Sequence, residues 1–225
     1  MVNIAILHIE DNDKTFNSEI KSLKKVLDNY RNYKGKENPA SKYEYKKDVI
    51  KLSNCTLHFK EKKVNLGPKP TNDTIEYNLC EIQNEINELK KDLGMDRVIL
   101  VIDICLDSEE NKPFPESFAK GISELNCVSG CIFKTAGVVA AQLFKGKGLT
   151  ANGFFSSRSV SPNTNEFVWS TTDSSQYEFE NRIDEIGNES IREIVKDFSG
   201  TDSINLRYFA TIFLVAGLAI GNQED

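Results

Sequence analysis

Residues 99–104 read Ile99-Leu100-Val101-Ile102-Asp103-Ile104, an apolar run broken by a single aspartate. Residues 6–12 and residues 131–136 are two further short apolar runs that also finish in polar groups. Such short, nearly continuous apolar runs are typical of strands buried in a parallel sheet. In open α/β sheets the functional groups lie beyond the carboxyl ends of these strands. We therefore expect one sheet edge to carry four such groups, Glu10, Asp11, Asp103 and Thr135.

Strand and helix patterns alternate along the chain, which predicts an α/β fold. Strands are predicted at residues 2–9, 97–106, 128–133 and 153–157, with a hairpin or one long edge strand at 49–59. Helices are predicted where apolar residues recur at three- and four-residue spacings, at 14–32, 74–93, 115–125, 138–144, 177–198 and 206–220. The alternation predicts a doubly wound, parallel five-stranded sheet.

Composition narrows the classes of function. The chain has 225 residues, 28 Lys and Arg against 34 Asp and Glu, and a net charge of −6. Because phosphate contacts need clustered cationic side chains, we expect no direct binding of nucleic acid. The apolar run at 206–221 falls short of the ~20 residues that span a bilayer, so no membrane span is expected. No secretory signal pattern is visible and the five cysteines suit reduced thiols, which predicts a cytoplasmic protein.

The three strand ends together resemble the receiver domain of two-component response regulators, which implies that the parallel sheet is of the receiver or flavodoxin-like type. The resemblance is carried by the acidic pair Glu10-Asp11, by Asp103 in its apolar strand, and by Thr135-Ala136 at the end of a later strand. It covers residues 1–162, with an insertion at about residues 33–73 where the typical receiver is shorter. Residues 163–225 are then a C-terminal helical extension, because the stretch after Pro162 is rich in Ser, Thr and Asn like a linker.

The resemblance implies a phosphoacceptor site. Asp103 would accept a phosphoryl group from a phosphohistidine on a histidine kinase or phosphotransfer protein. Glu10, Asp11, Asp103 and the backbone carbonyl of Cys105 would hold Mg²⁺, a cation that favours carboxylate and carbonyl oxygens. The protein would thus be a regulatory phosphoacceptor rather than an enzyme.

The resemblance also implies a switch beside that site. Thr135 would donate its hydroxyl to a phosphoryl oxygen, and Phe155 is the aromatic residue that would repack. Receivers carry a lysine, usually followed by proline, after the last strand, whereas this chain has Ser157-Arg158-Ser159, so Arg158 is the expected cation. Lys134 suits that role less well, because strand alternation points its side chain away from that of Thr135.

Two alternatives remain open. The first is a pseudo-receiver, with the same fold but no phosphorylation, that acts as an interaction module. The second is a Mg²⁺-dependent phosphoryl-transfer or hydrolytic enzyme that uses Glu10, Asp11, Asp103 and Asp107. The helices at 177–198 and 206–220 are expected to pack on the main domain or to form a homodimer, because the second is too apolar to stay exposed alone. His8 is expected to be a packed histidine rather than a ligand.

Overall fold

The computed structural model of the chain describes ten segments. They are residues 1–11, 16–25, 44–46, 48–52, 55–106, 113–135, 153–157, 169–171, 182–199 and 204–221. The predictions for the helix at 138–144, for Asp107 and Arg158, and for the domain boundary at residue 162 lie outside the described residues.

An eight-stranded sheet forms the centre of the molecule, in the order β2-β3-β4-β1-β5-β6-β7-β8. Its five middle strands, β4-β1-β5-β6-β7, are mutually parallel, and antiparallel partners flank them on both edges. Numbered along the chain, the parallel strands follow the order 2-1-3-4-5, which is compatible with a flavodoxin-like fold. The strands are β1 (Val2–Glu10), β2 (Glu44–Lys46), β3 (Val49–Lys51), β4 (Cys55–Lys63), β5 (Arg97–Asp103), β6 (Val128–Thr135), β7 (Gly153–Ser157) and β8 (Trp169–Thr171).

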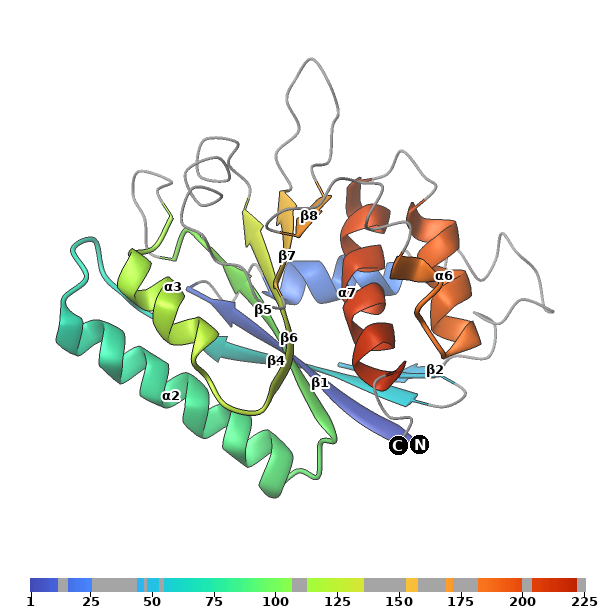
Figure 1. The fold of residues 1–225 in the computed structure, drawn as a ribbon, viewed down its shortest axis with the longest axis horizontal. Helices are drawn as coiled ribbons and strands as arrows, with labels where there is room; N and C mark the ends of the chain where they lie inside the picture. Colours follow the sequence, from blue (N-terminus) through green and yellow to red (C-terminus); the bar gives the residue numbers. More distant parts are fainter. Residues whose placement is uncertain are drawn as a thin grey trace, which may run out of the picture.

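Helices cover both faces of this sheet (Figure 1). One face carries α2 (Asn72–Lys91) and α3 (Glu116–Ser123). The other carries the helical residues 16–25 together with α6 (Glu189–Ser199) and α7 (Ile204–Gly221). We call these the α2 face and the α7 face. The prediction of an α/β fold with a mostly parallel sheet is confirmed.

The α2 face is a conventional helix-on-sheet interface. Thr71 caps α2 by accepting the Thr74 N–H at 3.2 Å, and the helix buries a stripe of residues at helical spacing. That stripe packs on alternate residues of the neighbouring strands. Its members are Ile75, Ile82, Ile86 and Leu89 of α2, with Ala5, Leu7, Ile9, Leu100 and Ile102 of the sheet.

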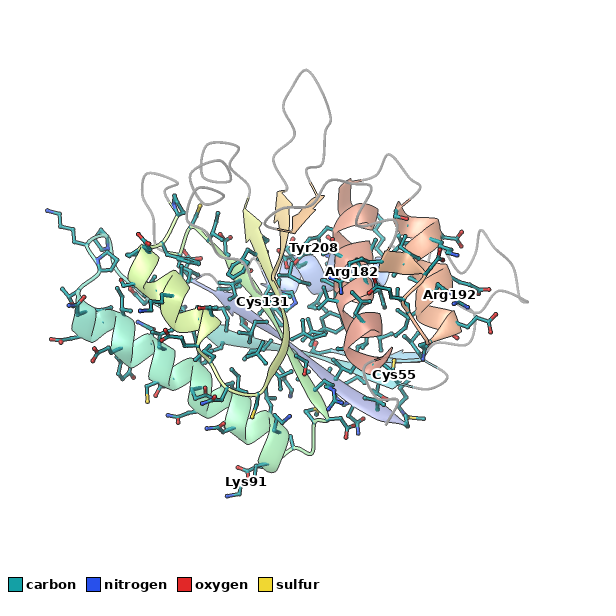
Figure 2. All side chains as sticks on the ribbon, in the orientation of Figure 1. Cys55, Lys91, Cys131, Arg182, Arg192 and Tyr208 are labelled. Carbon is teal, nitrogen blue, oxygen red and sulfur yellow. The ribbon has the colours of Figure 1, made fainter. Side chains whose placement is uncertain are left out.

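The α7 face is built around a helix that is apolar on every side. Residues 208–219 of α7 are all buried, because the sheet covers one side and α6 and the helical residues 16–25 pack in the same core. Figure 2 shows Tyr208 between α7 and the sheet, whereas Lys91 at the end of α2 extends outward. The prediction that this apolar segment buries itself is therefore confirmed. None of the described helices is long and apolar enough to cross a bilayer.

Two local predictions need correction. Within the helix predicted at 177–198, residues 182–183 are helical, residues 184–188 interrupt the helix, and α6 starts at Glu189. Asn188 caps α6, because its Oδ1 accepts the Ile191 N–H at 3.1 Å. Residues 44–46, for which no strand was predicted, form the edge strand β2, which pairs with β3. Of the two alternatives left open at 49–59, the structure shows the hairpin, formed by β3 and β4. Both strands fall within the predicted insertion at about 33–73, yet β4 is a central parallel strand beside β1.

Candidate functional site

Asp103 ends β5, which lies between β1 and β6 in the sheet. The Asp103 side chain is half-buried, and its Oδ1 accepts the backbone N–H of Cys105 at 2.9 Å. This bond folds the chain into a tight turn directly after the strand, as aspartate side chains commonly do. Asp103 is thereby held at the carboxyl edge of the parallel sheet, where the sequence predicts it.

The acidic pair ends the neighbouring strand β1, but its two members differ in exposure. Glu10 is only 1% exposed, whereas Asp11 is half-buried and follows the strand. Because side chains alternate along a strand, Glu10 falls on the same side as Ile4 and Ile6, which belong to the core of the α7 face. Glu10 therefore points into the interior rather than out of the sheet edge.

Lys134 is the partner of Glu10. It lies on β6, directly before Thr135, and is 2% exposed. Its Nζ donates to Glu10 Oε1 and, at 2.8 Å, to Glu19 Oε1. Both carboxylates are as deeply buried as the ammonium, with exposures of 1% and 3%. Burying charges is costly unless they are paired and hydrogen-bonded, and these three satisfy that condition together.

Glu19 extends this network into the helical layer. It lies among Phe16, Ile20 and Leu23 on the buried stripe of helical residues 16–25. Its second oxygen, Oε2, accepts the hydroxyl of Tyr208 on α7 at 3.1 Å. The network therefore joins two strands to two helices across the α7 face.

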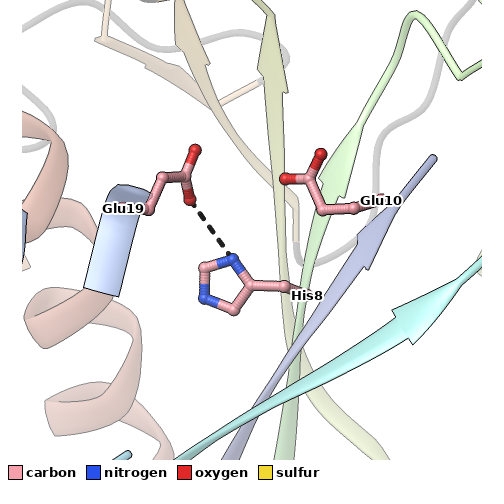
Figure 3. Close-up of side chains that lie close together, drawn as sticks. All are labelled: His8, Glu10 and Glu19. Atoms are coloured by element: carbon pink, nitrogen blue, oxygen red, sulfur yellow. Dashed lines mark ion pairs between the residues drawn. The ribbon is translucent and has the colours of Figure 1, made fainter. Parts of the chain in front are cut away.

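His8 completes the group, two residues before Glu10 on the same side of β1. Its Nδ1 lies 3.4 Å from Glu19 Oε2 (Figure 3). The ring packs against Phe16, with centroids 5.1 Å apart, and against Phe59 at 6.1 Å. The prediction of a packed histidine is confirmed, and we name His8, Glu10, Glu19, Lys134 and Tyr208 the buried polar network.

The three residues drawn in Figure 3 could by themselves be taken for a metal site. Ligand atoms of His8, Glu10 and Glu19 all lie within 4.8 Å of one another. The ammonium of Lys134, however, already contacts both carboxylates. A metal ion there would be placed against that positive charge, so we interpret the cluster as an internal ion-pair network.

The remaining predicted site residues are placed by the backbone. Cys105 follows β5 in the turn that Asp103 stabilises. Thr135 is the last residue of β6, and Phe155 lies in β7, paired in register with Phe133. The strand ends named in the sequence thus reach one edge of one sheet.

Glu19 and Tyr208 of the buried polar network were not predicted, nor was the pairing of Lys134 with its two carboxylates. Their partners are remote in sequence, since Lys134 is separated from Glu10 by 124 positions and from Glu19 by 115. Two local signals existed. Lys134 alternates with Ile132 in a part of β6 whose residues 130–133 are all buried, and Glu19 interrupts an apolar helical stripe.

Comparison with protein-family models, with curated proteins and with solved structures gave no match to this chain.

Proposed function

We propose that this chain is a receiver-like signalling protein in which Asp103 accepts a phosphoryl group and switches a protein–protein interaction. The observation that carries the proposal is the position of Asp103. It ends the third of five parallel strands ordered 2-1-3-4-5, beside the strand that finishes in Glu10 and Asp11. In sheets of this type ligands bind at the carboxyl edge, where the strand order reverses.

The chemistry asked of Asp103 is a simple displacement. One of its carboxylate oxygens attacks the phosphorus of a phosphohistidine, and the bond between phosphorus and the imidazole nitrogen breaks. The electron pair of that bond stays on the nitrogen, which takes up a proton. Asp103 is left as an acyl phosphate, and the donor is a histidine kinase or a phosphotransfer protein.

The oxygen atoms at this edge suit Mg²⁺. Asp11 and Asp103 offer carboxylates at the edge, and Cys105 offers a backbone carbonyl. Glu10 Oε2, a buried oxygen with no hydrogen-bond partner among the described residues, would have to reach the ion from the interior side. When bound, the ion would neutralise these carboxylates and the charge of the transferred group. Glu10 would contribute only through Oε2, because Lys134 holds Oε1.

Beryllofluoride, a mimic of the acyl phosphate, tests the proposal. We expect calorimetry to detect binding to the wild-type chain in the presence of Mg²⁺ and no binding to Asp103→Asn, which has the same shape but cannot coordinate beryllium in the same way. Asp96→Asn is the matched control, because Asp96 is an exposed aspartate at the opposite end of β5. Absence of binding to a folded wild-type chain would contradict phosphoacceptor chemistry.

A second candidate is a pseudo-receiver that works as an interaction module without phosphorylation. The ion pair between Lys134 and Glu10 favours it, because the ammonium compensates the charge of Glu10 without a metal ion. Under this alternative the wild-type chain binds neither Mg²⁺ nor beryllofluoride. The same calorimetry therefore separates the two candidates.

The burial of α7 bears on the predicted partners. The apolar residues that suggested a homodimer through the C-terminal helices are covered within one chain. A homodimer or a downstream partner would therefore bind a surface other than these buried residues. A cytoplasmic location belongs to the same proposal, since histidine kinases present their phosphohistidine there.

A further inference from the structure

We infer that Lys134 is the positioning cation for Asp103 and that, through Glu19 and Tyr208, it couples the charge at Asp103 to α7. This inference rests on the proposed function and deepens it. It assigns to a residue inside β6 the role that the resemblance gives to a lysine after the last strand. It also names the helix that responds when Asp103 is modified.

The first step is the relative placement of Lys134 and Asp103. The two residues are direct partners in the pairing of β5 with β6. Val101 and Ile132, each two positions earlier, belong to the core of the α7 face. By strand alternation Asp103 and Lys134 share that side, with backbones one strand spacing apart, about 4.8 Å.

The second step is the path from Lys134 to the helices. Its Nζ donates to Glu19 Oε1 at 2.8 Å, and Glu19 Oε2 accepts the Tyr208 hydroxyl at 3.1 Å. One carboxylate therefore bridges the ammonium on the sheet and the hydroxyl on α7. Any displacement of Lys134 changes the charge that Glu19 presents to Tyr208.

The third step is the consequence of phosphorylation. A phosphoryl group brings close to two negative charges to the Asp103 side chain. Lys134 would then be attracted to those oxygens and away from Glu10 and Glu19, which are the two anions it now holds. Because Tyr208 donates to the other oxygen of Glu19, the contact between α7 and the sheet would change with the position of Lys134.

The free-energy cost of burying the charges of the network favours a role in coupling Asp103 to α7. A buried ion pair is often no more stabilising than well-packed apolar residues of similar volume. Here the charges interrupt a core whose other members are almost all apolar, including Ile4, Ile6, Val101 and Ile132. The position beside a proposed acceptor aspartate gives a reason for retaining them.

The test combines beryllofluoride affinity with hydrogen exchange of α7. For Lys134→Met we expect binding weakened roughly tenfold to a hundredfold, the range for loss of one hydrogen bond to a charged group. Lys62→Met is the matched control, because Lys62 joins β4 to Glu81 of α2 at 3.0 Å on the opposite face. In the wild-type chain, beryllofluoride and Mg²⁺ should change the exchange rates of α7 amides.

Tyr208→Phe provides the readout that a merely structural role of the network would not move. We expect it to reduce the beryllofluoride-induced change in α7 exchange by more than half, while Tyr77→Phe, on the exposed side of α2, leaves that change intact. If Lys134→Met does not fold, Tyr208→Phe alone decides. An unaltered α7 response in Tyr208→Phe, or wild-type affinity in a folded Lys134→Met, overturns the inference. Failure of the wild-type chain to bind beryllofluoride instead overturns the proposed function.

Discussion

The two faces of the sheet are held by different chemistry. On the α2 face the interface is apolar, and its ion pairs, such as Lys62 with Glu81, lie at the rim with 21% and 37% exposure. On the α7 face the ion pairs of Lys134 with Glu10 and Glu19 lie inside the core, each partner no more than 3% exposed.

The difference indicates that the two faces have different roles. The α2 face stabilises the fold, whereas the α7 face can also respond to a charge added at Asp103. The α2 face gains from burial of apolar area, which does not depend on the protonation or modification of a side chain. The α7 face contains charges whose balance changes when a charge is added nearby. It is also the face that includes the side chain of Glu10 and, by alternation, that of Asp103.

Removing each lysine should give the largest contrast between the faces. Lys134→Met leaves two carboxylates buried without their cation, so we expect a loss of ~3–5 kcal/mol in the free energy of unfolding. Lys62→Met removes a partly exposed ion pair and should cost about 0–1 kcal/mol. Urea unfolding of both variants measures the difference. Equal losses in the free energy of unfolding would show that the buried polar network stabilises the fold no more than the Lys62–Glu81 pair does.

Alanine substitutions of Gly130 and Gly121 should give a smaller difference in stability between the two faces. A Cβ at Gly130 of β6 would lie 2.5 Å from Cγ1 of the buried Val215 on α7, so Gly130→Ala should cost about 1–3 kcal/mol through overpacking. A Cβ at Gly121 of α3 would meet Cδ1, Cδ2 and, at 3.1 Å, Cγ of the half-buried Leu79, a side chain that can rotate away. Gly121→Ala should therefore be nearly neutral in thermal unfolding, and the reverse ranking would contradict the packing described for α7.

The pH dependence at His58 should give the smallest effect. Burial, and next the charge of Lys60, lower the pKa of His58 below 6.5 in the folded chain. The unfolded chain therefore binds this proton first, so stability is full above pH 6.5 and falls as the pH drops from there to the folded pKa.

His58→Gln should remove that component. Urea midpoints of the variant and the wild type, compared at about pH 7.5 and about pH 5.5, isolate it, because the other titrating groups are common to both chains. A variant that loses stability on acidification as steeply as the wild type would show that His58 does not contribute.

The sequence predicted the scaffold better than the interior of the site. Apolar runs such as 99–104 identify parallel strands because burial on both faces demands continuous apolar residues, and this holds for β1, β5 and β6. The start of α6 was missed because an asparagine cap acts through one local hydrogen bond that helical periodicity does not register. From the sequence, Lys134 was judged only by the direction of its side chain relative to that of Thr135. Its partners are brought to it by the sheet order and by the helical residues 16–25, which no local pattern encodes.

The most direct test of the central claim is phosphoryl transfer to Asp103 itself. The full chain would be incubated with phosphoramidate, a small phosphodonor, and Mg²⁺, and its intact mass followed over time beside that of Asp103→Asn. The proposed function predicts a mass increase of one phosphoryl group that is lost in Asp103→Asn, retained in Asp96→Asn, and mapped to Asp103 after borohydride reduction of the acyl phosphate. An unchanged mass in the folded wild-type chain, or a phosphoryl group mapped to another residue, would contradict it.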